Sequence, residues 1–260
     1  MKRYLSDNKL KIIFSLSSLI LMWLTWIIAF AVVKNDLVIP SFWQTVNKVF
    51  ALFGEGYFWL AFLNTLKRVA IAFAISFITG LICSAIGVLI KNFNVFLSPL
   101  ITVLRTVPTM AIILILLIWT SPKIAPVIIT VLVLFPMIYA QINAAIGQID
   151  SGILQVAKVY DFSKKTKLTK IYLPMVFPYV FSQTGANLSF AIKLIISAEV
   201  MANTYVSIGG LMMEANAYIQ IENLAALTLI AVIAGVIIEL IFYFINRLCF
   251  KWNRVEVKND

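Results

Sequence analysis

The sequence predicts an all-α protein, a polytopic transmembrane bundle of about six helical spans. Of its 260 residues, 62% are hydrophobic and only 12% are charged, which is more apolar material than one soluble core of this size can enclose. The apolar residues gather in long runs, and the basic residues lie mostly between the runs. The surplus of 21 Lys and Arg over 11 Asp and Glu therefore indicates orientation in a lipid bilayer, and not nucleic-acid binding, which needs a polar basic face.

Each apolar run is about 20 residues or longer, the length that a helix needs to cross about 30 Å of hydrocarbon. The predicted spans are 12–33, 58–90, 96–118, 124–149, 173–202 and 224–249. The first is too long for a signal-peptide core and no small-residue cleavage site follows it, so we expect a retained span. Together the spans predict a single transmembrane domain over residues 1–260.

Lys and Arg concentrate in alternate connections between the spans. With the N-terminus inside, the outer side receives only Lys34, Lys48, Lys67, Arg68 and Lys123. The inner side receives Lys2, Arg3, Lys9, Lys11, Lys91, Lys158, Lys164, Lys165, Lys167, Lys170, Arg247, Lys251, Arg254 and Lys258. This bias predicts that both termini are cytoplasmic.

Two connections on the predicted outer side have a composition that indicates more than a simple loop. Residues 41–53 carry apolar side chains at helical spacing, so we expect a helix that lies flat at the outer interface. Residues 203–223 form a more polar excursion between the last two spans.

The connection that starts at Asp150 is the only long one on the predicted inner side. Asp150 or Ser151 can cap a short helix, and Asp161 and Ser163 can end it before a Lys-rich stretch that suits anionic lipid headgroups. Its apolar residues recur at helical spacing: Ile153, Leu154, Val156, Ala157 and Tyr160. Such an amphipathic helix is either a membrane-surface element or a docking surface for a soluble partner, and the small Ala157 suggests close approach to a groove.

The spacing around this helix resembles the signature of the binding-protein-dependent permeases of type I ABC importers. That signature is E-A-A, three residues, G, nine residues, then I-x-L-P. The matching positions here are Gln155, Val156, Ala157, Asp161, Ile171, Leu173 and Pro174. Glu, the first Ala and Gly are replaced by Gln, Val and Asp while the spacing is kept. Because Asp tolerates the left-handed backbone region better than most residues, the turn at Asp161 can survive. The resemblance implies that residues 150–174 form a cytoplasmic loop that couples to an ATPase.

Further stretches are similar to the nitrate, sulfonate and taurine permease family, which also includes importers of thiamine-precursor pyrimidines. They are 38–41, 64–69, 104–108, 135–136, 198–199, 207–211 and the pair Arg247 and Trp252. The resemblance thus covers about 38–252. It implies a type I ABC importer permease fold and a solute that is either a nitrate-, sulfonate- or taurine-like anion or a thiamine-precursor-like small molecule.

The resemblance also implies partners in a bacterial cytoplasmic membrane. These are a second permease copy, so that a homodimer forms, two ATP-binding subunits on the cytoplasmic side, and an extracytoplasmic solute-binding protein. The sequence agrees on one point, since none of its Gly residues falls in a G-x-x-x-x-G-K-[ST] loop. We therefore expect a permease that is not an enzyme and holds no cofactor, with ATP and Mg²⁺ bound by the partner ATPase.

Two other functions compete with this interpretation. An ion-coupled secondary transporter or channel would use acidic residues within the membrane. Against it, the sequence shows no inverted repeat, and such a protein does not need the docking loop that starts at Asp150. An intramembrane enzyme is disfavoured because the sequence has no His and no paired carboxylate motif. Its two cysteines, Cys83 and Cys249, lie in apolar surroundings without metal-type spacing, so we expect neither a metal site nor a disulfide.

Charged side chains inside the predicted spans each cost about 2.5 to 3.5 kcal/mol on insertion scales, so each needs a reason. Arg105, beside the break at Pro108, either meets an anionic solute in the path or binds backbone carbonyls freed by the break. Lys193 either selects anions or pairs with an acid on another span. Glu199 either lines the path as a gate residue or makes an interhelix hydrogen bond; Lys193, six residues away, points to a different face. Glu239 is expected to pair with a basic residue near the inner interface.

Overall fold

A computed structural model of the protein describes residues 2–36 and 38–250, and over these residues the chain forms helices and no strand. In chain order the elements are α1 (Lys2–Val33), α2 (Phe42–Phe53), α3 (Gly56–Leu89), α4 (Phe93–Thr106), α5 (Thr109–Trp119), α6 (Ala125–Gly147), α7 (Ser151–Val159), α8 (Lys164–Lys167), the π-helix η1 (Leu168–Tyr172), α9 (Leu173–Ala202), α10 (Ile208–Ala217) and α11 (Ile221–Cys249). The all-α fold is confirmed.

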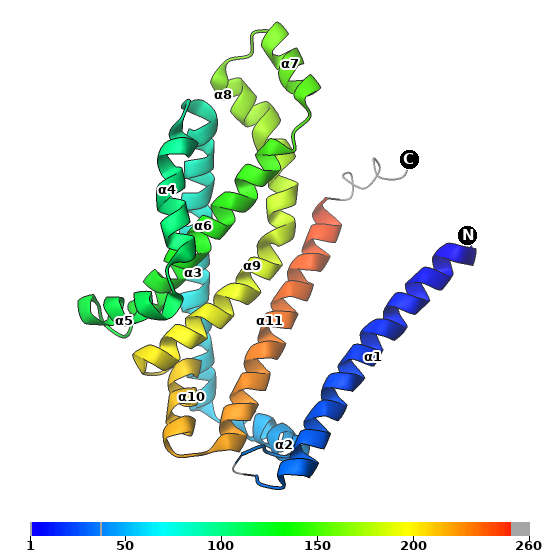
Figure 1. Ribbon diagram of the computed structural model, residues 1–260, viewed down its shortest axis with the longest axis vertical. Helices are drawn as coiled ribbons and strands as arrows, with labels where there is room; N and C mark the ends of the chain where they lie inside the picture. The colour runs from blue at the N-terminus through cyan, green and yellow to red at the C-terminus, as the bar shows by residue number, and fades with distance from the viewer. Residues whose placement is uncertain (1, 37, 251–260) are drawn as a thin grey trace.

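Five of the predicted spans are continuous helices, namely α1, α3, α6, α9 and α11 (Figure 1). Each is long and apolar enough to cross a membrane. Their bounds agree with the sequence to within a few residues, except that α1 begins at Lys2 and not at residue 12. The predicted polar excursion at 203–223 contains a helix, α10, that the sequence did not indicate.

The predicted span over 96–118 is interrupted beside Pro108, at the break that the sequence indicated. The segment is a broken pair, α4 and α5, whose axes are bent by 96°. Pro108 has no N–H to donate, and a residue that precedes Pro is driven out of the helical region. Val107 accordingly has φ −64° and ψ 130°. In Figure 1, α4 runs along the bundle and α5 lies across its direction, while Ile113 of α5 stays packed against α6 and α9.

One apolar core lies between α3, α6, α9 and α11. Phe58, Leu134, Ile195 and Leu227 supply one large, fully buried side chain from each of these helices. By contrast, the hydrophobic part of α1 has no residue buried in the bundle. It meets α2 through the edges of Trp23 and Trp26 against Phe42, so most of its surface faces outward.

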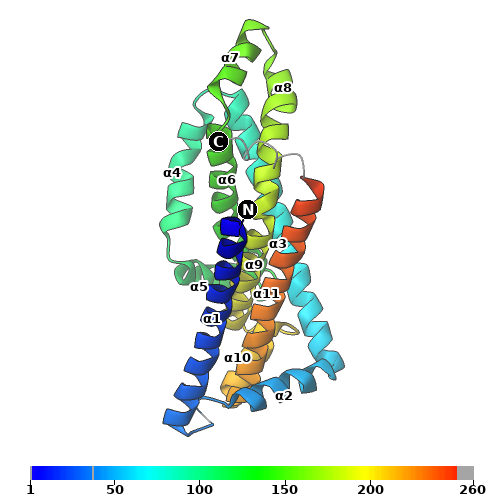
Figure 2. The same cartoon turned by 90° about the vertical axis from the view of Figure 1, so that its right-hand side faces the viewer.

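The two ends of the molecule are occupied by different elements (Figures 1 and 2). The helix α2 runs across one end and confirms the predicted helix at 41–53. Ser41 and Gln44 form its capping box, since the Ser41 hydroxyl accepts from the Gln44 N–H and the Gln44 side chain accepts from the Ser41 N–H. The helix α7 projects at the opposite end, toward which the start of α1 and the end of α11 also point. Trp252 and the basic residues Lys251, Arg254 and Lys258 lie outside the described residues.

Candidate functional site

The predicted short helix at the inner connection is α7, and its two ends are built as the sequence indicated. Asp150 is the N-cap, and its side chain accepts a 2.6 Å hydrogen bond from the Gly152 N–H. Asp161 has φ 45°, in the left-handed region, which confirms the turn there. Around that turn the Phe162 N–H donates to the Ala157 carbonyl at 2.9 Å, which satisfies that carbonyl near the end of α7.

Part of the outer surface of α7 is apolar, beside the exposed polar residues Ser151 and Lys158. Val159 is 82% exposed and Tyr160 73%, while Ile153 and Val156 are also exposed. Leu154 is half-buried and Gln155 is exposed. An exposed apolar group on a projecting helix is typical of an interaction surface. We call the exposed set Ile153, Val156, Val159 and Tyr160 the α7 face.

The expectation that Ala157 itself approaches a groove on a partner is wrong for this structure. Ala157 is 1% exposed because it packs against its own chain. The small residue is needed inside the loop, where the backbone folds back at Phe162, so the surface that a partner could touch is the α7 face.

The loop returns to the membrane as an almost unbroken helical run, α8, η1 and α9. The Leu173 N–H donates to the Leu168 carbonyl, an i to i−5 bond that makes the turn a π-helix. Such a wide turn lets the run accommodate Pro174, which has no N–H of its own. Ile171 is buried, whereas Leu173 and Pro174 are exposed.

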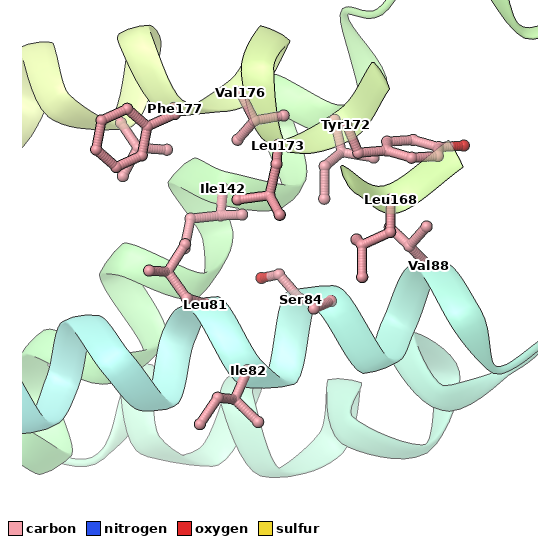
Figure 3. Close-up of a pocket in the computed structure, with 13 residues that line it drawn as sticks. Leu81, Ile82, Ser84, Val88, Ile142, Leu168, Tyr172, Leu173, Val176 and Phe177 are labelled. Carbon is pink, nitrogen blue, oxygen red and sulfur yellow. The ribbon is translucent and has the colours of Figure 1, made fainter. Parts of the chain in front are cut away.

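A pocket of about 250 Å³ separates this run from α3 and α6 (Figure 3). Its lining is almost entirely apolar and includes Leu81, Ile142, Leu173 and Val176. Figure 3 shows the hydroxyl of Tyr172 directed away from the gap. A charged solute would lose its hydration here without compensation, so this pocket is a packing gap at the base of the loop and not a solute site.

One lysine of the basic stretch has a structural contact. The Lys164 Nζ donates a 3.0 Å hydrogen bond to the carbonyl of Leu89, at the C-terminal end of α3. A cation is favourable there because the last carbonyls of a helix carry partial negative charge. Lys165 and Lys170 are exposed.

Far from the loop along α9, the carboxylate of Glu199 joins three helices. It is completely buried, and Arg68 of α3 donates to Oε1 at 2.7 Å. Thr65 of α3 donates to Oε2 at 2.9 Å, and the Gly209 N–H of α10 donates to the same oxygen at 3.2 Å. The Thr65 hydroxyl in turn accepts from the Ile208 N–H at 3.0 Å. We call Thr65, Arg68, Glu199 and Gly209 the Glu199 cluster.

The residues around the Glu199 cluster allow α10 to approach α9 closely. A Cβ at Gly209 would collide with Glu199 and with the backbone of Val200, so only glycine fits. Ser207 caps α10 by accepting from the Gly210 N–H at 2.8 Å. Of the two roles considered for Glu199, this geometry favours the interhelix bond.

Sequence reasoning missed Arg68 as the partner of Glu199, because it counted Arg68 among the outer basic residues. The available signal was its position well inside the apolar segment 58–90, where an unpaired cation is costly. Among the side chains that the structure describes, Arg68 and Glu199 form the only ion pair and Glu239 forms none, so the predicted pairing of Glu239 with a basic residue is wrong for this part of the chain.

The other predicted path residues do not join this cluster. Arg105 and Pro108 are exposed at the bend between α4 and α5, and Arg105 makes no hydrogen bond to the part of the chain that the structure describes. Lys193 and Glu239 are both exposed and line a groove of about 590 Å³ between α9 and α11. Most of the lining of this α9–α11 groove is apolar, and its polar residues are Ser189, Lys193, Ser197, Thr228 and Glu239.

Residues 87–255 match the model of a protein family described as the binding-protein-dependent transport system inner membrane component. The chain belongs to this family. The match includes α7, Glu199 and the α9–α11 groove, and it begins after Thr65 and Arg68.

Among curated relatives of this inner membrane component, the putative aliphatic sulfonates transport permease of Bacillus subtilis is 23% identical over 72% of this chain and 68% of its own length. The nitrate import permease of Synechococcus elongatus is 32% identical over 55% of this chain and 51% of its own length. The bicarbonate transport system permease of the same organism is 31% identical over 60% of this chain and 56% of its own length. The matches thus span only about half the length of the last two relatives.

A solved structure supports the fold. The crystal structure of an amino acid ABC transporter with histidines contains a chain that superimposes with a TM-score of 0.62. It is 17% identical and the superposition covers 72% of this chain and 91% of that one. The helical arrangement is therefore that of an ABC transporter permease, and the chain is a transport component of the inner membrane and not an enzyme.

Proposed function

We propose that this permease is the membrane subunit of an ATP-driven importer and that the α7 face is where an ATPase docks. The observation that carries the proposal is α7 itself, a capped helix that projects from the bundle with Val159 and Tyr160 exposed. Its position in the signature-like spacing from Gln155 to Pro174 supports the same role. An apolar helix face set into a groove is a common mode of docking between proteins.

The proposed assembly contains two copies of this chain, two ATP-binding subunits and an extracytoplasmic solute-binding protein in a bacterial cytoplasmic membrane. ATP and Mg²⁺ bind to the ATPase. The excess of basic residues in the connections on the α7 side supports placing α7 and both termini in the cytoplasm.

Force on α7 would reach the membrane through α8, η1 and α9. The run from Lys164 to Ala202 is helical throughout, so it transmits displacement as a stiff element. The apolar pocket at its base leaves room for its first turns to shift against α3. Its far end is bonded to α3 and α10 through the Glu199 cluster. Rocking of this element would alternate the opening of the path between the two sides.

The relatives carry the names of sulfonate, nitrate and bicarbonate transporters, which supports a small anionic solute. In this proposal Arg105 and Lys193 are the cations that face the path, Pro108 sets the bend beside it, and Glu199 holds the gate helices together. A thiamine-precursor-like molecule is the other solute class that the sequence resemblance implies.

The test is reconstitution of the permease in proteoliposomes with the ATPase and binding protein encoded beside it. We expect solute uptake that requires ATP, and ATP hydrolysis that rises when loaded binding protein is added. Uptake driven by an ion gradient without the ATPase would instead support the secondary-transporter alternative.

A further inference from the structure

A second concentration of charge lies between the start of α6 and the half of α3 nearer α2. It is a pocket of about 350 Å³, and the polar or charged residues in its lining are Asn64, Lys67, Arg68 and Lys123. None of the described residues that line it is an acid. Only five basic residues were predicted on the side of the membrane opposite α7, and three of them line this one pocket. We call it the basic pocket.

Two of its three cations are not balanced by an acid. Arg68 donates one N–H to Glu199 at 2.7 Å, so its charge is compensated, but a guanidinium has further N–H donors in the same plane. Lys67 and Lys123 are exposed, and neither forms an ion pair with a residue that the structure describes. The basic pocket therefore attracts an anionic group.

The depth of the pocket follows from how α3 and α6 lie side by side. A Cβ at Gly80 would meet Ile138, 58 positions later in the chain. The Asn143 side chain donates to the Ser84 hydroxyl at 3.2 Å, across 59 positions. The two helices thus run parallel with a constant offset, which makes Lys67 level with the start of α6.

The other ends of the same helices mark one membrane interface. The offset makes the end of α3 at Leu89 level with the end of α6 at Gly147. Lys91 follows there, and Lys164 donates to the Leu89 carbonyl. Counted from these ends, about 30 Å of hydrocarbon takes about 20 helical residues, which reaches to about residue 70 of α3 and about residue 128 of α6. The cations of the basic pocket lie just beyond, at the level of the lipid headgroups on the opposite side.

Along both helices the lining changes from charged to apolar in the same direction. On α3, Lys67 is followed one turn deeper by Ile71, and on α6 the order continues from Lys123 to Ile124 and Val127. Ile71 is 42% exposed and Ile124 is 55% exposed. A phospholipid has the same order, with a charged phosphate at the interface and acyl chains below it. A small free anion would use only the cations, and an acidic peptide from solution would leave the two isoleucines uncovered.

We propose that the basic pocket binds the phosphate of an anionic phospholipid in the leaflet opposite α7. The phosphate oxygens accept from Lys67, Lys123 and the N–H groups of Arg68 that do not bond Glu199. An acyl chain lies along the apolar part of the lining. This role is separate from the proposed transport cycle and does not depend on it.

A headgroup in this position joins parts of the bundle that the protein itself connects only weakly. It bridges α3 to the connection before α6. That connection is also bonded to the segment after α9, because the Thr204 hydroxyl donates to the Pro122 carbonyl at 2.8 Å. The lipid site therefore lies beside the Glu199 cluster and shares Arg68 with it.

The experiment follows the two lysines by NMR in the full chain, whose lysines carry isotope-labelled dimethyl groups and keep their positive charge. The chain is placed in phosphatidylcholine nanodiscs, and the fraction of phosphatidylglycerol is raised. The resonances of Lys67 and Lys123, assigned by their loss in Lys67→Gln and Lys123→Gln, should shift together and saturate. Arg68 is left unchanged because it also bonds Glu199.

Binding of one headgroup by both lysines couples them. Lys67→Gln should therefore raise about fivefold the fraction of phosphatidylglycerol that half-shifts the Lys123 resonance, since loss of one lysine near the membrane surface removes about 1 kcal/mol. Lys123→Gln should have the same effect on Lys67. The matched control is Lys34→Gln, an exposed lysine outside the basic pocket, which should change neither transition.

If each lysine titrates unchanged after loss of the other, the inference is overturned, because the two would then only attract the charged surface separately. Equal shifts with millimolar inorganic phosphate in pure phosphatidylcholine would also overturn it and make the pocket a site for free oxyanions. Shifts caused by the solute-binding protein and not by phosphatidylglycerol would make it a docking surface instead. Both variants should keep the wild-type thermal midpoint in pure phosphatidylcholine, and a lower midpoint there would mean that the lysines serve only to hold α3 and α6 together.

Discussion

Removal of the Arg68 charge should destabilise the protein more than any surface change. Arg68→Met keeps most of the side-chain volume of Arg68 but leaves the Glu199 carboxylate buried without its cation. The bonds from Thr65 and Gly209 remain, at 2.9 and 3.2 Å. Breaking a buried pair by removing one partner costs about 3 to 5 kcal/mol, since the remaining charge is not solvated.

The size of this effect separates two descriptions of the cluster. An interhelical hydrogen bond between neutral side chains in a membrane contributes about 0.6 kcal/mol on average. If Arg68 acted only as one such donor, the thermal midpoint would change by roughly 1 to 2 °C, because a domain of this size shifts by about 2 to 4 °C per kcal/mol. Loss of the ion pair should instead lower it by roughly 6 to 20 °C.

The assay is thermal unfolding of the purified chain in lipid nanodiscs. Arg68→Met with Glu199→Gln should recover much of the loss, because the uncompensated charge is gone. Glu214→Gln removes an exposed carboxylate from α10 and should stay within about 0.5 kcal/mol of the wild type. A thermal midpoint of Arg68→Met within about 2 °C of the wild type would refute the claim that the Arg68–Glu199 ion pair stabilises the packing of α3 against α9.

Three further substitutions test other parts of the structure. Val159→Asp on the α7 face should leave the thermal midpoint unchanged but reduce co-purification with the ATPase at least tenfold, because a docked carboxylate would be desolvated. The control is Lys165→Glu, a change at another exposed residue. If Val159→Asp couples normally to the ATPase, α7 is not the docking site. Gly209→Ala should cost about 1 to 3 kcal/mol in thermal unfolding because its Cβ meets Glu199, whereas Gly147→Ala, with open space around it, should not. Arg105→Lys should leave stability within about 0.5 kcal/mol of the wild type, since Arg105 is exposed, and a larger loss would mean that it holds the carbonyls at the bend.

Local patterns were enough to predict the elements that depend on local physics. Apolar run length located five spans, apolar residues at helical spacing located α2, and the cap at Asp150 located the start of α7. The left-handed turn at Asp161 followed from one residue type at one spacing. These features depend on backbone conformation and burial that a short segment determines by itself.

The features that the sequence did not predict depend on contacts between distant segments. Pro108 indicates a break, but the 96° angle is determined by what α4 and α5 pack against. Arg68 and Glu199 are 131 residues apart, and no local pattern pairs them. The burial of Ala157 depends on how the chain folds back after α7. In each case the residue type was informative, and the missing information was its neighbour in space.

The arrangement of these parts explains why α9 suits the role of a transmission element. A helix that transmits force must be connected at one end to the element that receives the force and at the other end to the helices that move. Its first turns must also be able to shift against their neighbours. Here α7 is joined by the short turn at 160–163 to the helical run of α8, η1 and α9. Among the described hydrogen bonds, the only one from α8 to α3 is Lys164 to the Leu89 carbonyl. The apolar pocket beside η1 removes packing contacts that would otherwise resist displacement. At the far end the Glu199 cluster bonds α9 to α3 and α10 at once, so a shift of α9 there must move both helices or break a buried ion pair. Because breaking that pair is costly, movement of the three helices as one body is the lower-energy outcome.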